Sequence, residues 1–252
     1  MIEFQDLTRA YGDFTAVKPL ALTVARGEVF GFLGPNGAGK TTTIRMMMGI
    51  LVPSGGRALV NGLDCHSERA LVQRHVGYLP DNPIYYDFLR GREILQFVAE
   101  MHGMPRAAAV ARTQQLLGEF GLADVVDEFA VNYSMGMKKK LGLACALIHD
   151  PDVLILDEPI NGLDPRAARE VQDRLKAAAA QGKTIFMSTH LLDMAERVCT
   201  RVGIIHRGEL VTTGTLAELR ERVVPGGSLE QVFLKVTDEG AAEDAGAPAG
   251  TP

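Results

Sequence analysis

Three largely apolar runs organise this chain, and each leads directly into glycine or polar side chains. The runs lie at residues 29–33, 153–156 and 184–189. An unbroken apolar run is typical of a parallel strand buried on both faces, and ligands bind at the carboxyl ends of such strands. The pattern therefore predicts an α/β fold with a binding site at one edge of a parallel sheet.

The segments around these runs predict two further parts. Residues 1–30 alternate short apolar segments with turns, and turn sequences at 53–56 and 61–62 flank a hairpin. Residues 89–149 instead carry helical periodicity, which is broken at Gly103, Pro105 and Gly121. We therefore expect an N-terminal antiparallel β subdomain and a helical subdomain inserted into the α/β core.

The C-terminal part changes character near Val236. Before it, Thr215-x-x-Glu218 and Ser228-x-x-Gln231 are capping boxes that predict two terminal helices. After it, the chain contains only small, polar and acidic residues with proline, which is typical of disorder. The sequence thus predicts one domain over residues 1–236 and a disordered tail over 237–252.

The first apolar run leads into a complete G-x-x-x-x-G-K-[ST] phosphate loop, followed by a helical pattern from Thr43. Backbone N–H groups converge in such a loop where the helix dipole favours an anion, so we expect it to bind a nucleoside triphosphate. Lys40 can neutralise the β- and γ-phosphates, the Thr41 hydroxyl can ligate Mg²⁺, and Thr42 is expected to reach the α-phosphate. The predicted nucleotide-binding residues here are Gly34, Pro35, Asn36, Gly37, Ala38, Gly39, Lys40, Thr41 and Thr42.

The other two runs end in side chains suited to phosphate chemistry. Asp157 and Glu158 follow the second run, and His190 follows the third. At these strand ends Asp157 is placed to hold Mg²⁺, Glu158 to orient or deprotonate a water, and His190 to contact the γ-phosphate. The alternatives are an acidic helix cap at 157–158 and a structural histidine.

Three other features have two interpretations each. Tyr11 is either an adenine-stacking ring or an ordinary hairpin aromatic. The aromatic cluster at 82–89 either receives a helix of a membrane partner or belongs to the subdomain core. Lys138, Lys139 and Lys140 either bind nucleic acid or form a solvated face, and we favour the solvated face.

Composition narrows the functional classes. The 252 residues carry a formal net charge of -5, so no global basic field attracts nucleic acid or anionic lipid. The three cysteines are scattered and the six histidines form no ligand cluster, so Mg²⁺ is the metal we expect. The apolar runs are too short to span a bilayer, and the N-terminus is no secretory signal, which predicts a cytosolic protein without membrane insertion.

Taken in order, the motifs resemble those of the ATP-binding cassette (ABC) ATPases over residues 2–235. The family has a phosphate-loop NTPase (RecA-like) core with the two subdomains predicted above. Beyond the phosphate loop and the strand ending in Asp157 and Glu158, the resemblance rests on Tyr78-Leu79-Pro80-Asp81, Tyr133-Ser134-Met135-Gly136-Met137, Gly162-Leu163-Asp164-Pro165 and Ser188-Thr189-His190.

The resemblance implies a role for each matching residue. Two cassettes of this family pair head to tail around two ATP molecules. Tyr11 matches the adenine-stacking aromatic, Glu158 the catalytic carboxylate and His190 the γ-phosphate switch. Ser134 and Gly136 match the signature that caps the ATP of the opposite subunit, and Asp164 matches a loop at the dimer interface.

Two positions depart from the usual family pattern. Met135 and Met137 replace Gly and Gln of the signature, while Ser134 and Gly136 remain. Asp81 stands where most relatives have a Gln that contacts Mg²⁺ and the attacking water; a carboxylate can also ligate Mg²⁺ but adds charge beside a polyphosphate. These departures and the segment 228–234 are similar to the ATPase subunits of type-2 ABC exporters.

The resemblance implies an ATP-hydrolysing subunit that uses Mg²⁺, forms a homodimer and drives a separate membrane permease, most like that of an exporter. It would lie in the cytoplasm, peripheral on the inner face of the cell membrane. The alternative is a soluble ABC-type mechanical ATPase that acts on ribosomes or DNA. Such proteins usually carry two cassettes or a long coiled coil, and neither is present in the sequence.

Overall fold

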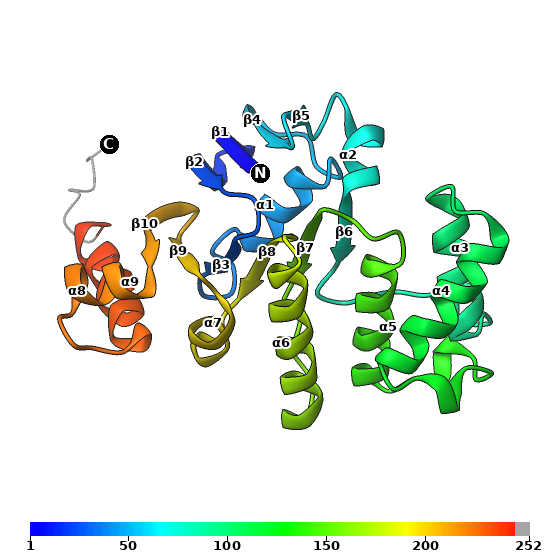
Figure 1. Ribbon diagram of the computed structural model, residues 1–252. Coiled ribbons are helices and arrows are strands. Elements are labelled where there is room, and N and C mark those ends of the chain that lie inside the picture. The colour runs from blue at the N-terminus through cyan, green and yellow to red at the C-terminus, as the bar shows by residue number, and fades with distance from the viewer. Residues whose placement is uncertain (245–252) are drawn as a thin grey trace.

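The computed structural model describes residues 1–244 and contains two β-sheets flanked by helices (Figure 1). The antiparallel sheet has the strand order β2-β1-β4-β5, and the core sheet has the order β10-β9-β3-β8-β7-β6. The antiparallel strands are β1 (Ile2–Tyr11), β2 (Phe14–Val24), β4 (Gly55–Val60) and β5 (Leu63–Asp64). The core strands are β3 (Val29–Leu33), β6 (Val76–Leu79), β7 (Val153–Asp157), β8 (Thr184–Thr189), β9 (Arg201–His206) and β10 (Glu209–Thr215).

The three apolar runs predicted as buried strands are β3, β7 and β8, which lie next to one another in parallel. Successive side chains of a strand point to opposite faces, and both faces of these strands are covered. Leu154 and Leu156 of β7 belong to the apolar cluster on the helical face, whereas Val153 and Ile155 face the antiparallel sheet. Burial on both faces explains why the runs are largely apolar.

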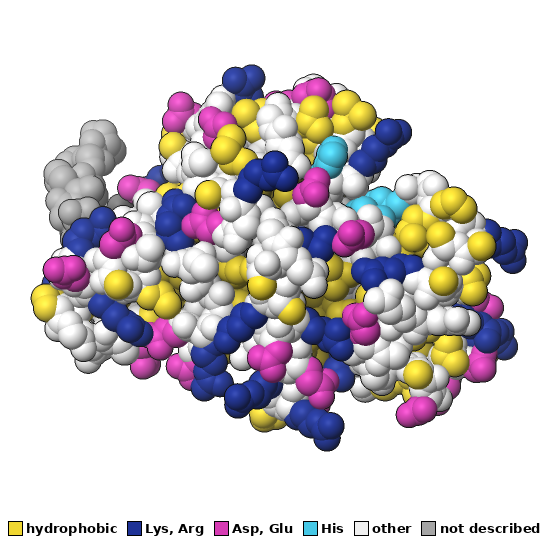
Figure 2. All heavy atoms as spheres, in the orientation of Figure 1, with side chains coloured by type: hydrophobic (Ala, Val, Ile, Leu, Met, Phe, Trp, Pro, Cys, Tyr) yellow, Lys and Arg dark blue, Asp and Glu magenta, His cyan; other side chains and the backbone are white. Residues whose placement is uncertain are grey.

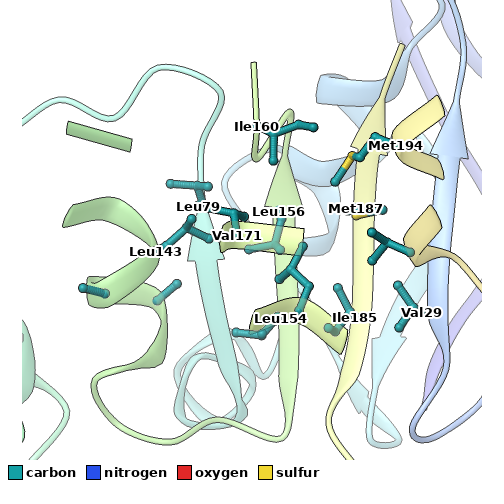
Figure 3. Packing of buried hydrophobic residues seen from close by; sticks show 14 of the residues in the cluster. Val29, Leu79, Leu143, Leu154, Leu156, Ile160, Val171, Ile185, Met187 and Met194 are labelled. Carbon is teal, nitrogen blue, oxygen red and sulfur yellow. The ribbon is translucent and has the colours of Figure 1, made fainter. Parts of the chain in front are cut away.

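The helical face of the core sheet is covered by α5 (Met135–Leu147), α6 (Pro165–Ala180) and α7 (Leu192–Val198). Figure 3 shows Leu79, Leu156 and Val171 close together between the sheet and α6. On the other face, α1 (Lys40–Met47) packs with Phe30, Phe32 and Phe186 between the two sheets. The helix α2 (Arg69–His75) precedes β6. This packing holds the carboxyl ends of β3, β7 and β8 at one edge.

The helices within residues 91–147, α5 among them, form the predicted helical subdomain, on the right in Figure 1. It contains α3 (Gly91–Met101), α4 (Arg106–Glu119) and α5, with short 3₁₀ turns at Ala123–Val125 and Ala130–Asn132. Its buried residues join the same apolar cluster as the helical face of the core sheet. The subdomain is therefore packed against the core.

The C-terminal helices are α8 (Leu216–Val223) and α9 (Leu229–Asp244). Both begin at the predicted capping boxes: Thr215 bonds Glu218 reciprocally, and Ser228 bonds Gln231. The helix α9 continues to Asp244, so the prediction of a disordered tail from 237 is wrong for residues 237–244. Small and acidic residues are compatible with a helix once its first turns are capped and packed. The rest of the predicted tail, 245–252, lies outside the described residues.

Candidate functional site

The phosphate loop connects β3 to α1 and curls around the side chain of Lys40. Gly39 has a φ of 106°, and a Cβ atom there would lie 2.7 Å from the backbone oxygen of Ala16, so this position requires glycine. The ammonium of Lys40 donates to the backbone oxygens of Gly34, at 2.6 Å, and Pro35, at 3.1 Å. The loop thus holds a buried cation at the N-terminus of a helix.

Asp157 is a buried carboxylate at the end of β7 whose neighbours are hydroxyl groups. It accepts hydrogen bonds from Ser188 and Thr41. Burial raises the pKa of Asp157, and these hydrogen bonds oppose the rise. Hydroxyl and carboxylate oxygens are ligands that Mg²⁺ prefers, so Thr41 and Asp157 together fit that ion.

Glu158 adopts a left-handed backbone conformation, with φ of 49°, directly after β7. Its backbone N–H lies 3.2 Å from both the backbone oxygen and the hydroxyl of Ser188. One carboxylate oxygen, Oε1, lies 3.0 Å from Nδ1 of His190 and 3.7 Å from Nζ of Lys40. The other, Oε2, is buried without a hydrogen-bond partner among residues 1–244. An unpartnered oxygen fits a carboxylate that hydrogen-bonds a ligand or water.

A cleft of about 280 Å³ lies over these groups. Tyr11 and Phe14 are directly opposed at the end of the β1–β2 hairpin and both line it. The guanidinium of Arg9 lies 4.4 Å from the ring centre of Tyr11. Phe14 was missed by the sequence analysis, although its position opposite Tyr11 in the hairpin turn could have indicated it. The cleft is lined by Tyr11, Phe14, Ala16, Asn36, Gly37, Gly39, Lys40, Thr41, Thr42, Asp81 and Glu158.

Lys139 contradicts the favoured prediction that 138–140 form a solvated face. Its side chain is 3% exposed, and Nζ donates to the backbone oxygen of Asp81 at 2.5 Å. The same nitrogen lies 3.5 Å from a carboxylate oxygen of Asp81. Lys140 pairs with Glu170 of α6 at 3.2 Å. Helical periodicity is the reason, because Lys139 occupies the face of α5 that packs on the loop after β6.

The predicted signature and dimer residues lie apart from this cleft. Ser134 is the N-cap of α5, where its hydroxyl accepts a hydrogen bond from the backbone N–H of Met137 at 3.2 Å. Asp164 is the N-cap of α6 and accepts from Arg166 and Ala167. Neither these two residues nor Gly136 is among the described residues that line the cleft.

The aromatic cluster at 82–89 divides between its two interpretations. Tyr85 packs against the core and donates to the backbone oxygen of Lys138 at 2.8 Å. Ile84, Tyr86 and Phe88 are exposed, Ile84 to 92%. A hollow of about 640 Å³ is lined by Tyr85, Tyr86, Asp87, Phe88, Leu89 and Phe97. The lining of this apolar hollow therefore combines a ring packed against the core with exposed side chains.

Basic and acidic side chains are interspersed over the face shown in Figure 2. Within residues 1–244, we found no helix with both the length and the apolar character that a membrane span requires.

The comparisons with known proteins agree with one another. The family model described as ABC transporter matches residues 17–161. The chain is 37% identical to the probable multidrug ABC transporter ATP-binding protein YbhF of Escherichia coli over 94% of its own length, but spans only 41% of that relative. It is 38% identical to the daunorubicin resistance ATP-binding protein DrrA3 of Streptomyces coeruleorubidus, over 90% of this chain and 71% of that protein.

A solved structure titled as an ATP-binding subunit of an ABC transporter is also similar. It superposes with a TM-score of 0.88 at 34% identity, and the match covers 94% of this chain and 99% of that one. The predicted fold class, a phosphate-loop α/β core with an antiparallel β subdomain and a helical insertion, is thereby confirmed. The family model and the relatives together show that the chain belongs to the ABC transporter family, as an ATP-binding cassette.

Proposed function

We propose that the chain binds ATP with Mg²⁺ in the cleft and hydrolyses it. The observation that carries this proposal is the approach of Lys40, from the phosphate loop after β3, to Glu158 at the carboxyl end of β7, in a cleft that Tyr11 also lines. Asp157 precedes Glu158 at the same strand end. Lys40 would neutralise the β- and γ-phosphates, and Tyr11 would stack on adenine. Thr41 and Asp157 would hold Mg²⁺, with Asp81 beside them; the bound ion would neutralise developing phosphate charge.

Glu158 is suited to orient the attacking water. Its Oε1 is held by His190 and Lys40, which leaves Oε2 to accept a hydrogen bond from the water. As oxygen attacks phosphorus, Glu158 would take the water's proton while His190 contacts the γ-phosphate. In-line attack then breaks the bond between the γ-phosphorus and the bridging oxygen, and ADP retains that oxygen.

A second copy of the chain would complete each site. Ser134 and Gly136 stand at the N-terminus of α5, where the helix dipole favours an anion, yet they do not line this chain's own cleft. We propose that they cap the ATP bound by the opposite copy, with Asp164 at the interface. The expected assembly is a head-to-tail homodimer with two equivalent sites.

We further propose that the dimer drives a separate integral membrane permease, in the direction of export, from the cytoplasmic face of the membrane. Two relatives support this: one is named as a probable multidrug transporter protein and the other as a daunorubicin resistance protein. The apolar hollow around Phe88 and Phe97 is the proposed contact for the permease. A large exposed apolar patch is typical of a protein interface.

Two experiments test these proposals. Calorimetry should detect ATP binding that Lys40→Ala weakens at least about tenfold, whereas Lys176→Ala, an exposed lysine on α6, should not weaken it. Purification of the tagged chain from detergent-solubilised native membranes should yield a polytopic membrane protein, and Phe88→Ser should lose it. Recovery of ribosomes or DNA instead would favour the mechanical ATPase.

A further inference from the structure

Lys139 is a buried cation to which the proposed reaction assigns no role. It comes from α5, in the helical subdomain, and reaches the loop that follows β6 in the core. Its ammonium contacts Asp81 twice, at 2.5 Å to the backbone oxygen and 3.5 Å to the carboxylate. A buried ammonium is costly unless it is paired and hydrogen-bonded, so these contacts account for its position.

Lys139 interacts electrostatically with Asp81 and with the other two carboxylates of the site. Burial lowers the pKa of Lys139, while the charges of Asp81, Asp157 and Glu158 raise it. Lys40 approaches Glu158 from the phosphate loop. The three carboxylates are therefore flanked by one lysine from the loop and another from the helical subdomain.

The negative charge of Asp81 would act in opposite ways on the triphosphate and on its metal ion, and Lys139 can neutralise that charge. A nucleoside triphosphate is an anion, and a third carboxylate at the cleft would repel it while attracting its divalent cation. The Asp81 carboxyl group is 38% exposed and lines the cleft, so it lies where both ligands would come. Paired with Lys139, it contributes no net charge.

We propose that Lys139 is a positioning residue of the nucleotide site. It fixes Asp81 against α5 and cancels its charge, so that the metal and the triphosphate meet a neutral pair instead of a third free carboxylate. This inference rests on the proposed function, because it assumes that the cleft binds a nucleotide with a divalent cation.

A second contact also holds the loop after β6 against α5. The hydroxyl of Tyr85 donates to the backbone oxygen of Lys138 at 2.8 Å, and Gly142 lies one turn further along α5. A Cβ atom at Gly142 would lie 2.8 Å from the Tyr85 hydroxyl, so the loop and the helix are in close contact. Lys139 and Tyr85 thus hold the two ends of the segment 81–85.

The test is a charge cycle at positions 81 and 139 with two separate ligands. Fluorescence titration measures ATP affinity in EDTA, and electron paramagnetic resonance measures the affinity of the nucleotide-free protein for Mn²⁺. Lys139→Met should weaken ATP binding about tenfold and strengthen Mn²⁺ binding several-fold, because it exposes one negative charge to both ligands. Lys139→Arg keeps the charge and should keep both affinities close to those of the original chain.

The reverse change and the double change complete the cycle. Asp81→Asn leaves Lys139 unpaired, so ATP binding should tighten and Mn²⁺ binding should weaken. Combining Asp81→Asn with Lys139→Met should return both affinities to within about twofold of the original, because the double variant removes both charges of a neutral pair. Asp81 is part exposed, so its single variant still tests the proposal if Lys139→Met does not fold.

A purely structural role predicts a different result. If Lys139→Met weakens the binding of both ligands, or if the double variant keeps the loss of ATP affinity seen in Lys139→Met, Lys139 supports the fold and the inference is wrong. ATP binding by the unsubstituted protein tests the proposed function separately. If that protein does not bind ATP, with or without a divalent cation, the proposed function is wrong. The opposite shifts of Mn²⁺ affinity in the single variants would still decide the role of Lys139.

Discussion

The Nδ1 atom of His190 lies 3.0 Å from Oε1 of Glu158, across the edge formed by β7 and β8. Glu158 is buried, whereas the side chain of His190 is 39% exposed. The pair therefore joins a carboxylate inside the site to an imidazole at its surface. This contact fixes the orientation of the carboxylate, while its second oxygen has no hydrogen-bond partner in the described part of the chain.

Removal of this imidazole should slow phosphate release. We expect His190→Ala to reduce the rate about 100-fold, because the carboxylate loses its orienting partner and the γ-phosphate loses a contact. The matched control is His75→Ala, since His75 makes a similar contact, 3.1 Å to Asp152, on the surface away from the cleft. Equal effects of both substitutions in a phosphate-release assay would contradict the role of His190.

A second prediction concerns the close packing of β6 on α5. A Cβ atom at Gly77 would collide with the backbone oxygen of Ala146, which cannot move without displacing the helix. Gly77→Ala should therefore lower the free energy of unfolding by about 2 kcal/mol or more. Gly118→Ala, in α4, should instead raise it by about 0.5 kcal/mol, because no described residue lies near the position of the added Cβ. Urea denaturation of both variants measures the difference.

The pH dependence of stability should include a contribution from His149. Burial lowers the pKa of His149 from its ordinary value of 6.5 to about 4, helped by His102, whose ring is stacked on it at 3.6 Å. Because the folded state disfavours the protonated form, stability is full above pH 6.5 and falls as the pH decreases toward 4. His149→Asn should make this fall less steep.

The control for that prediction is His66→Gln, which changes an exposed histidine. Urea denaturation at several pH values between 4 and 7 gives the free energy of unfolding for each protein. An unchanged slope in His149→Asn would show that another group causes the acid sensitivity.

Nucleotide selectivity should depend on the hairpin aromatics. We expect Tyr11→Ala to weaken ATP binding about fivefold, the effect of losing one stacked ring, and Tyr11→Phe to preserve it. Phe14→Ala should weaken it less, because Phe14 is 66% exposed. Calorimetry with ATP and with inorganic triphosphate measures the effect: only ATP, which carries the base, should respond to Tyr11→Ala.

Much of the site could be predicted because it lies at strand ends. Once 29–33, 153–156 and 184–189 were interpreted as parallel buried strands, Lys40, Glu158 and His190 had to meet at one edge, and the structure brings them together. This follows from local pattern and sheet geometry, without knowledge of long-range side-chain contacts.

The features that the sequence did not predict are those that depend on tertiary packing. Lys139 belongs to the same run of three lysines as the part-exposed Lys138, and only the placement of α5 against Asp81 makes it buried. Ser188 was identified as part of a motif, yet its hydrogen bonds to Asp157 and to the backbone of Glu158 could not be predicted from sequence. Likewise, composition past Val236 indicated disorder where α9 in fact continues.

In the proposed mechanism, Glu158 and its neighbours hydrolyse ATP at a site completed by a second copy of the chain. Size-exclusion chromatography with light scattering of Glu158→Gln, in ATP and Mg²⁺, distinguishes a dimer from a monomer. We predict a stable dimer that retains ATP, because binding persists while the proton acceptor is lost. A monomer with ATP bound, or hydrolysis at the original rate, would contradict this mechanism.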